Sequence, residues 1–144
     1  MLVKKEKIFD NIVAVSGTKK EAIRTISRLC AKQTMLEKAF WKREEWDSTG
    51  CGEGIAIPHA IIKEIDEVQL FIVRFRYPIE WESFDDKKVD IAFAIIAPEE
   101  KGQEKYLVFL SRLARKLVDE KFIADFRNCR STEAVYQYVK NELE

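Results

Sequence analysis

Apolar residues recur every three or four positions in five segments of this chain, with charged and polar residues between them. This spacing places the apolar side chains on one face of a helix, so each segment predicts an amphipathic helix packed against a core. The helices are predicted over residues 18–30, 34–46, 104–118 and 120–127, and after an N-cap at Ser131 or Thr132. Two of them open with a capping box, Thr18 with Glu21 and Thr34 with Glu37.

Short runs rich in β-branched and aromatic residues form a second pattern, which predicts strands. These runs cover residues 55–57, 68–75 and 89–97, and residues 7–15 form a further extended segment. Pro58 and Pro98 directly follow two of the runs. Because proline has no N–H to donate to a ladder, each is expected to end its strand. Between the regular elements we expect a turn or edge segment at residues 77–81, a charged turn at 85–88 and a polar loop at 99–103.

Helices and strands alternate along a chain of 144 residues, which predicts the α/β class and a single domain spanning residues 1–144. The expected architecture is a mixed central β-sheet flanked by helices. The sequence contains no repeat, no low-complexity tract and no linker that would divide it.

Opposite charges are balanced, with 25 Lys and Arg residues, 25 Asp and Glu residues and a formal net charge of zero at pH 7. This balance argues against nucleic acid and anionic membranes as partners, because both select a basic surface. No run approaches the ~18–20 apolar residues of a membrane-spanning helix, and residues 1–7 lack the apolar core of a signal peptide. We therefore expect a cytoplasmic protein with no direct membrane insertion.

The three cysteines, Cys30, Cys51 and Cys129, are widely spaced and form no CxxC pair. The spacing indicates neither a zinc site nor a disulfide framework, and reduced thiols fit a cytoplasmic protein. No metal or other cofactor is expected. Cys51 lies in a glycine-rich loop, but no neighbouring residue argues for an activated thiolate there, so we interpret it as a bystander.

Candidate chemistry is concentrated in residues 47–60, DSTGCGEGIAIPHA. Three glycines at alternate positions allow the backbone to approach a ligand closely, and a short apolar run and a proline then lead to His59. His59 is the only histidine of the chain, and we expect it at the end of a strand, on the edge of a loop. From the residues alone, a structural loop with a structural histidine is the favoured interpretation.

Residues 48–59 resemble the phosphorylation-site signature of the mannitol/fructose-type enzyme IIA domains of the bacterial phosphotransferase system. The resemblance is strongest from Trp41 to Ala60 and extends more weakly over the whole layout. It implies that His59 accepts a phosphoryl group from the carrier protein HPr and passes it to a sugar-specific enzyme IIB. On this interpretation the protein is a phosphoryl carrier that does not bind the sugar itself.

A phosphoryl group on His59 requires a neutral ring nitrogen as nucleophile, and imidazole meets this need because its unperturbed pKa is ~6.5. The incoming group brings about two negative charges, so it needs cationic and N–H partners. Arg43 is the preferred cation over Lys42 because its planar fork suits phosphate, and the family's motif places an arginine followed by a glutamate at this spacing. Further donors are expected from the loop as a phosphate-binding nest, namely from Ser48, Thr49, Gly50 and Gly52.

Two positions carry alternative interpretations. Glu53 could orient the active histidine, or it could be an exposed loop carboxylate. Tyr106 stands where many family members have a second histidine beside the active one. Its hydroxyl could donate to a phosphoryl oxygen, or its ring could only pack at the start of a helix.

Two rival functions remain open at this level. A nitrogen-related enzyme IIA would keep the fold and signal to other proteins through its phosphorylation state. A non-catalytic module would use the glycine-rich loop to hold an anion, with His59 as a simple contact.

Overall fold

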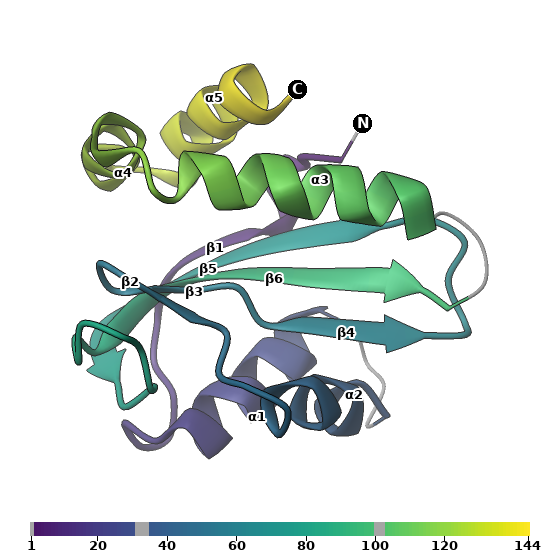
Figure 1. Ribbon diagram of the computed structural model, residues 1–144. Helices are drawn as coiled ribbons and strands as arrows, with labels where there is room; N and C mark the ends of the chain where they lie inside the picture. Colours follow the sequence, from purple (N-terminus) through teal and green to yellow (C-terminus); the bar gives the residue numbers. More distant parts are fainter. Residues whose placement is uncertain (1, 31–34, 100–102) are drawn as a thin grey trace.

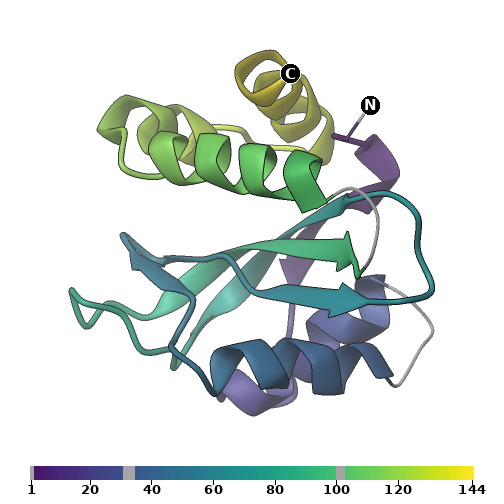
Figure 2. The ribbon, with the colours of Figure 1, turned by 45° about the vertical axis from the view of Figure 1, so that its right-hand side comes forward.

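The computed structural model describes residues 2–30, 35–99 and 103–144 (Figure 1). Within these residues, six strands form one mixed sheet with helices on both faces (Figures 1 and 2). Two helices, α1 (Lys19–Cys30) and α2 (Met35–Glu44), cover one face. Three more, α3 (Gln103–Lys116), α4 (Glu120–Arg127) and α5 (Thr132–Leu143), lie on the other. The predicted α/β class with a mixed, helix-flanked sheet is confirmed.

The sheet has the order β1-β5-β6-β3-β2, and β4 also pairs with β6. Its strands are β1 (Ile8–Ile12), β2 (Gly50–Gly52), β3 (Ile55–Ala56), β4 (His59–Ile62), β5 (Gln69–Ile79) and β6 (Val89–Pro98). β6 runs antiparallel to β5 and parallel to both β3 and β4, whereas β1 is parallel to β5 and β2 antiparallel to β3. A short 3-10 turn, η1 (Lys5–Lys7), precedes β1.

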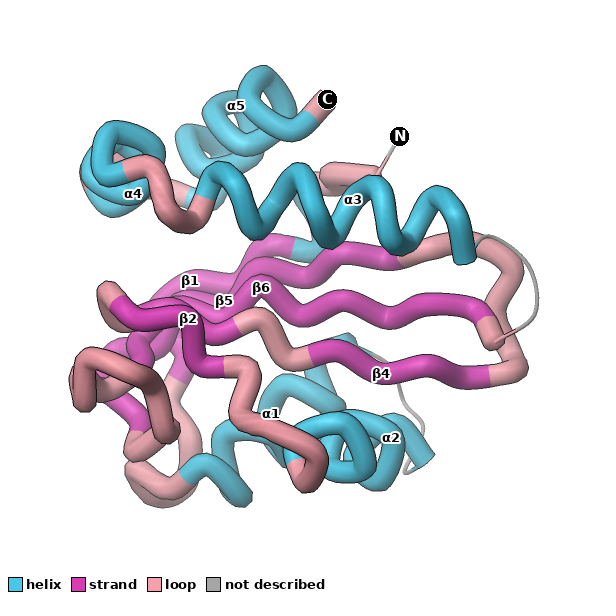
Figure 3. The backbone as a smooth tube through the Cα atoms, viewed as in Figure 1, coloured by secondary structure: helices cyan, strands magenta, loops and turns pink. Residues whose placement is uncertain are grey.

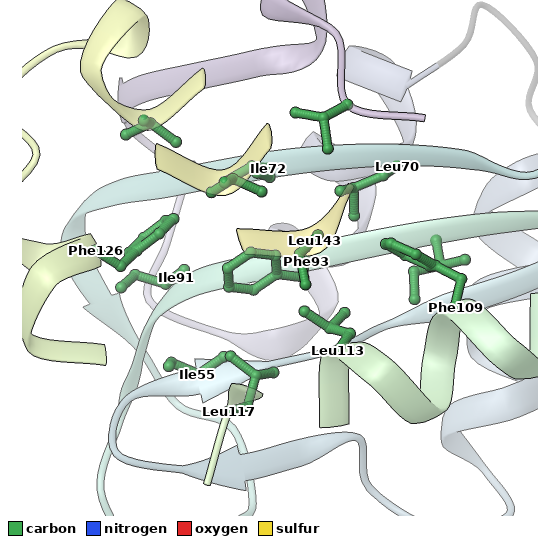
Figure 4. Close-up of a cluster of buried hydrophobic side chains, with 14 of the residues drawn as sticks. Ile55, Leu70, Ile72, Ile91, Phe93, Phe109, Leu113, Leu117, Phe126 and Leu143 are labelled. Carbon is green, nitrogen blue, oxygen red and sulfur yellow. The ribbon is translucent and has the colours of Figure 1, made fainter. Parts of the chain in front are cut away.

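The central strand β6 is buried on both faces from Ile91 onward, which explains why its sequence after Asp90 is a continuous apolar run rather than an alternating one. Ile91, Phe93 and Ile95 pack towards α3, α4 and α5, in the cluster drawn in Figure 4. The residues between them pack into a second cluster with α1 and α2. The sheet therefore separates two cores.

Strand β4 was not predicted. It continues β3 in the same register along β6, because Ile55 lies opposite Ile91 and His59 lies opposite Ile95. Pro58 cannot donate to the ladder, but its carbonyl accepts a hydrogen bond from the Ile95 amide at 2.9 Å. β3 therefore ends before Pro58, as expected, but a further strand that was not expected, β4, begins directly after the proline at His59.

Most other boundaries agree with the sequence-based expectation, with small shifts. Residues 77–79 extend β5 beyond a register shift instead of forming a turn, and α2 ends at Glu44, two residues early. Thr18 caps α1 by accepting the Glu21 amide at 3.3 Å, and Ser131 rather than Thr132 caps α5. The predicted cap at Thr34 and residues 100–102 of the predicted loop lie outside the described residues.

Candidate functional site

His59 is the first residue of β4, the strand that lies along the edge of the sheet beside α2 (Figure 3). His59 is buried, with only 7% of its surface exposed. The imidazole faces the α3 side of the sheet, where its ring centroid is 6.3 Å from that of Tyr106. His59 therefore lies at the end of a strand, as expected, but it is the first residue of β4 and is buried, so the expectation of a side chain on a loop edge outside the core is wrong.

The tautomer of His59 follows from a contact within the interrupted strand. The Nδ1 atom lies 2.8 Å from the carbonyl oxygen of Ile57. Since a carbonyl oxygen can only accept, Nδ1 carries the proton and Nε2 is left with its lone pair. No sequence pattern could reveal this partner, because any residue at position 57 would supply a carbonyl.

The surroundings keep the imidazole neutral. Burial is the main cause that lowers the pKa of His59 below its ordinary value, and the charge of Arg43 lowers it further. The hydrogen bond to Ile57 and the charge of Glu44 oppose this shift. A neutral ring with a free Nε2 is the form that can act as a nucleophile.

A groove of about 640 Å³ lies between α2 and β4 at His59. Its lining is Met35, Ala39, Lys42, Arg43, Trp46, His59, Ile61, Ile62, Lys63, Glu64 and Glu99. Arg43 donates from Nη1 to the carbonyl of Asp47 at 2.7 Å, which occupies one of the five N–H donors of its guanidinium. The remaining donors can bind an anion delivered to the imidazole.

Tyr106, near the start of α3, is 5% exposed and completes the surroundings of His59. Burial raises the pKa of its phenol, and the charge of Arg43 opposes that rise. The hydroxyl therefore stays protonated near neutral pH and can donate. The structure thus brings together three predicted site residues, His59, Arg43 and Tyr106.

The polar residues of the glycine-rich loop use their donors within the chain. Thr49 donates its amide to Glu44 at 3.1 Å, and its hydroxyl also donates to Glu44. The Ser48 hydroxyl donates to the Glu82 carbonyl at 2.6 Å and accepts the Gly50 amide at 3.2 Å. A phosphate contact from Ser48, Thr49 or Gly50 would require these bonds to exchange, so the predicted nest stays a prediction.

The glycines have steric reasons that do not involve a ligand. A Cβ on Gly50 would lie 2.2 Å from the Glu82 carbonyl oxygen, far closer than any contact allows. Gly52 has φ +88° and belongs to β2, which pairs with β3 in a hairpin. The hairpin packs against the segment that follows β5, because a Cβ on Gly52 would meet the Phe84 ring.

Glu53 lies at the tip of this hairpin. Its carboxylate pairs with Lys87 at 3.3 Å and is more than half exposed, and its amide donates to Asp85 at 2.7 Å. The Nδ1 position that an orienting carboxylate would bind is occupied by the Ile57 carbonyl. Of the two interpretations of Glu53, the geometry agrees with the exposed loop carboxylate.

One buried charge next to the site was given no role by the sequence. Glu44, adjacent to Arg43, has a fully buried side chain paired with Lys19. The only feature of the sequence that pointed to Glu44 was its place directly after Arg43 in the family's motif. The thiol of Cys51 has its pKa raised to about 11, mainly by burial, so it is not a nucleophile at neutral pH.

Comparison with known proteins identifies the family to which this chain is similar. The family model described as "Phosphoenolpyruvate-dependent sugar phosphotransferase system, EIIA 2" matches residues 1–142. A nitrogen regulatory protein of Escherichia coli K12 is 36% identical over 129 residues, which cover 85% of this chain and 78% of that protein.

Two solved structures show the same fold. The crystal structure of nitrogen regulatory protein IIA-Ntr from Neisseria meningitidis has a TM-score of 0.85 and 24% identity, covering 94% of each chain. Enzyme IIA of the mannitol system from Escherichia coli, solved in complex with phosphorylated enzyme IIB, has a TM-score of 0.73 and 20% identity. The match covers 94% of this chain and 95% of that one.

Among the described residues, no helix is long and apolar enough to cross a membrane.

The family match extends over nearly the whole chain and includes the segment that carries His59. The chain therefore belongs to the EIIA 2 family of the phosphoenolpyruvate-dependent sugar phosphotransferase system, a family of phosphoryl carriers.

Proposed function

We propose that His59 accepts a phosphoryl group reversibly on Nε2. The observation that carries the proposal is the hydrogen bond of Nδ1 to the Ile57 carbonyl, 2.8 Å long, which leaves Nε2 as the nucleophilic nitrogen. The lowered pKa of His59 supports the same role, because an unprotonated Nε2 persists below the pH at which a free histidine would lose it.

The transfer step is a displacement at phosphorus. The Nε2 lone pair forms the new nitrogen–phosphorus bond, the bond between phosphorus and the donor atom breaks, and that atom keeps the electron pair. The proton stays on Nδ1, and the Ile57 carbonyl that accepts its hydrogen bond stabilises the positive charge that develops on the ring. The Arg43 guanidinium and the Tyr106 hydroxyl stabilise the phosphoryl oxygens.

The proposed donor is the phosphorylated carrier protein HPr, and the proposed acceptor is an enzyme IIB. The acceptor is supported by the mannitol enzyme IIA of the same fold, which was solved with phosphorylated enzyme IIB. Both partners must reach the same nitrogen, so they bind in turn over the groove beside α2 and β4. Such contacts are transient and bury a small area.

A regulatory role is the second candidate. It is favoured by the 36% identity over 85% of this chain to a protein named as a nitrogen regulatory protein. In that role His59 would gain and lose its phosphoryl group in the same way. The phosphorylated and unphosphorylated forms would then act on a regulated protein instead of supplying an enzyme IIB.

Incubation with phosphorylated HPr tests the acceptor. Intact-mass spectrometry should show one phosphoryl group per chain, labile in acid and stable in base, and His59→Gln should show none. A chain that gains no mass, or a His59→Gln variant that gains mass at the wild-type rate, would contradict the assignment. The second result would move the acceptor to another residue type, since His59 is the only histidine.

The phosphorylated protein is then offered to purified enzyme IIB proteins to separate the two candidate roles. Transfer to one of them at a rate matching its uptake from HPr supports the transport role. A phosphoryl group that is retained against all of them, yet returned to HPr, supports the regulatory role.

A further inference from the structure

A buried carboxylate connects three elements behind the groove. The side chain of Glu44, the last residue of α2, has no exposed surface. Its Oε1 atom lies 2.7 Å from the Nζ of Lys19 and accepts the Thr49 amide at 3.1 Å, and its Oε2 accepts the Thr49 hydroxyl. Glu44 therefore joins the first residue of α1 to the residue that precedes β2.

The cation of this ion pair is also enclosed. The Lys19 side chain is 11% exposed, and its ammonium lies over the rings of Trp41 and Trp81 at 5.9 and 5.3 Å. A second carboxylate, Glu82, approaches it at 3.1 Å from the exposed side. Because removal of both charges from water opposes their attraction, a buried pair is a weak source of net stability. A role at the neighbouring site gives a better reason for its presence.

Glu44 controls the turn on which Arg43 depends. Residues 45–49 connect α2 to β2, and the Asp47 carbonyl in this turn accepts a hydrogen bond from the Arg43 guanidinium at 2.7 Å. Glu44 itself begins the turn, and its two hydrogen bonds with Thr49 close the other end. The position of the Arg43 guanidinium is therefore set by a turn that one carboxylate fixes at both ends.

We propose that Glu44 is a positioning residue for phosphoryl transfer, which holds the Arg43 guanidinium beside His59 by binding Thr49. The proposal rests on the proposed phosphorylation of His59 and adds a residue to it. It also gives Thr49 a role, since both of its donors face Glu44 rather than a ligand.

The charge of Glu44 also acts on the imidazole. It raises the pKa of His59, against burial and against Arg43. With a neutral side chain at position 44, burial and Arg43 would act with less opposition and the pKa of His59 would fall further. The titration of His59 therefore reports the charge at position 44, and the uptake rate reports the position of Arg43.

The test uses four variants of the full chain. Glu44→Gln removes the charge and keeps the shape, and Glu82→Gln is its matched control because Glu82 shares Lys19 but makes no bond to Thr49. Thr49→Val removes the hydroxyl, and Thr49→Ser restores it. Each variant is measured for the rate of phosphoryl uptake from HPr. The His59 titration is followed by NMR, where the only histidine gives one set of ring signals.

We expect Glu44→Gln to lower the uptake rate about 10- to 100-fold, on the scale of losing an oriented donor. Its His59 titration should move to lower pH, while Glu82→Gln matches the wild type in both measurements. Thr49→Val should show a smaller loss of rate that Thr49→Ser restores. If Glu44→Gln does not fold, the Thr49 pair decides in its place.

A wild-type uptake rate in folded Glu44→Gln would overturn the positioning role, whatever its His59 titration, and would leave phosphorylation of His59 standing. Wild-type rate in Thr49→Val, with Glu44→Gln unfolded, would do the same. Failure of the wild-type chain itself to accept phosphate would overturn the proposed function and, with it, this role.

Discussion

At the scale of single residues, His59 and Arg43 differ in how their positions are held. The His59 backbone is part of β4, and its ring is fixed by the Ile57 carbonyl. The Arg43 side chain extends from a helix end, and its guanidinium donates a hydrogen bond to the Asp47 carbonyl. The imidazole is therefore held by its own strand, whereas the guanidinium depends on the turn after α2 and keeps its other donors for a phosphoryl group.

Replacement of Arg43 by lysine tests its fork-shaped geometry. Arg43→Lys keeps the charge but removes bidentate donation, so we expect the rate of phosphoryl uptake to fall about 10- to 100-fold. Rapid-quench kinetics measure the rate, and Arg115→Lys, an exposed arginine on α3, is the matched control. Wild-type rates for both Arg43→Lys and Arg43→Ala would return Arg43 to the class of solvated helix arginines.

Tyr106 is tested by removal of a single oxygen atom. If its hydroxyl donates to the phosphoryl group, Tyr106→Phe should shift the phosphoryl equilibrium with HPr by about 0.5–1.5 kcal/mol towards HPr. The equilibrium is measured by intact-mass spectrometry, with Tyr138→Phe as control because Tyr138 packs in the same core away from His59. An unchanged equilibrium would mean that the Tyr106 ring only packs at the start of α3.

At the scale of elements, the β2–β3 hairpin depends on close backbone approach. A Cβ on Gly50 would lie 2.2 Å from the Glu82 oxygen, whereas one on Gly17 would lie 3.6 Å from its nearest neighbour, an ordinary contact. Gly50→Ala should therefore lower the free energy of unfolding by about 1–3 kcal/mol, as overpacking does. Gly17→Ala should stay within about 0.5 kcal/mol of the wild type.

Urea unfolding followed by circular dichroism measures both glycine variants. Equal stability of Gly50→Ala and Gly17→Ala would show that the hairpin can move away from Glu82 without cost. In that case the close approach would not explain the glycine.

The periodic pattern predicted the helices and the long strands because each buries a full apolar face, as Phe93 and its neighbours on β6 do. It missed β4 because a four-residue strand directly after a proline has no pattern of its own. It also gave Glu44 no role, since a charged residue on an amphipathic helix normally faces water. Its burial depends on Lys19 and Thr49, which only the tertiary structure brings to it.

At the scale of the whole molecule, His59 couples stability to pH. Its pKa is lowered in the folded protein, while in the unfolded chain it lies near ~6.5. Below that pH the unfolded chain binds more protons, so the free energy of unfolding falls as the pH drops from ~6.5 through the folded pKa. Above ~6.5 both states hold a neutral ring, and the contribution is constant.

We expect the free energy of unfolding of the wild type to fall relative to that of His59→Gln on going from about pH 7.5 to about pH 5.5. Urea unfolding of both proteins at the two pH values measures it, and the comparison cancels the carboxylates that they share. A difference that is independent of pH would show that His59 titrates alike in the folded and unfolded chain.

The common register of β3 and β4 has a consequence for how this sequence can diverge. Ile55 lies opposite Ile91, and His59 lies opposite Ile95. The number of residues from Ile55 to His59 therefore equals the number from Ile91 to Ile95 on β6. One inserted or deleted residue between Ile55 and His59 would turn the imidazole to the opposite face of the sheet, away from Tyr106. Surface connections such as residues 63–68 face no such constraint. Insertions and deletions can therefore accumulate in the connections of this lineage, while the short stretch that leads to His59 can change only by substitution.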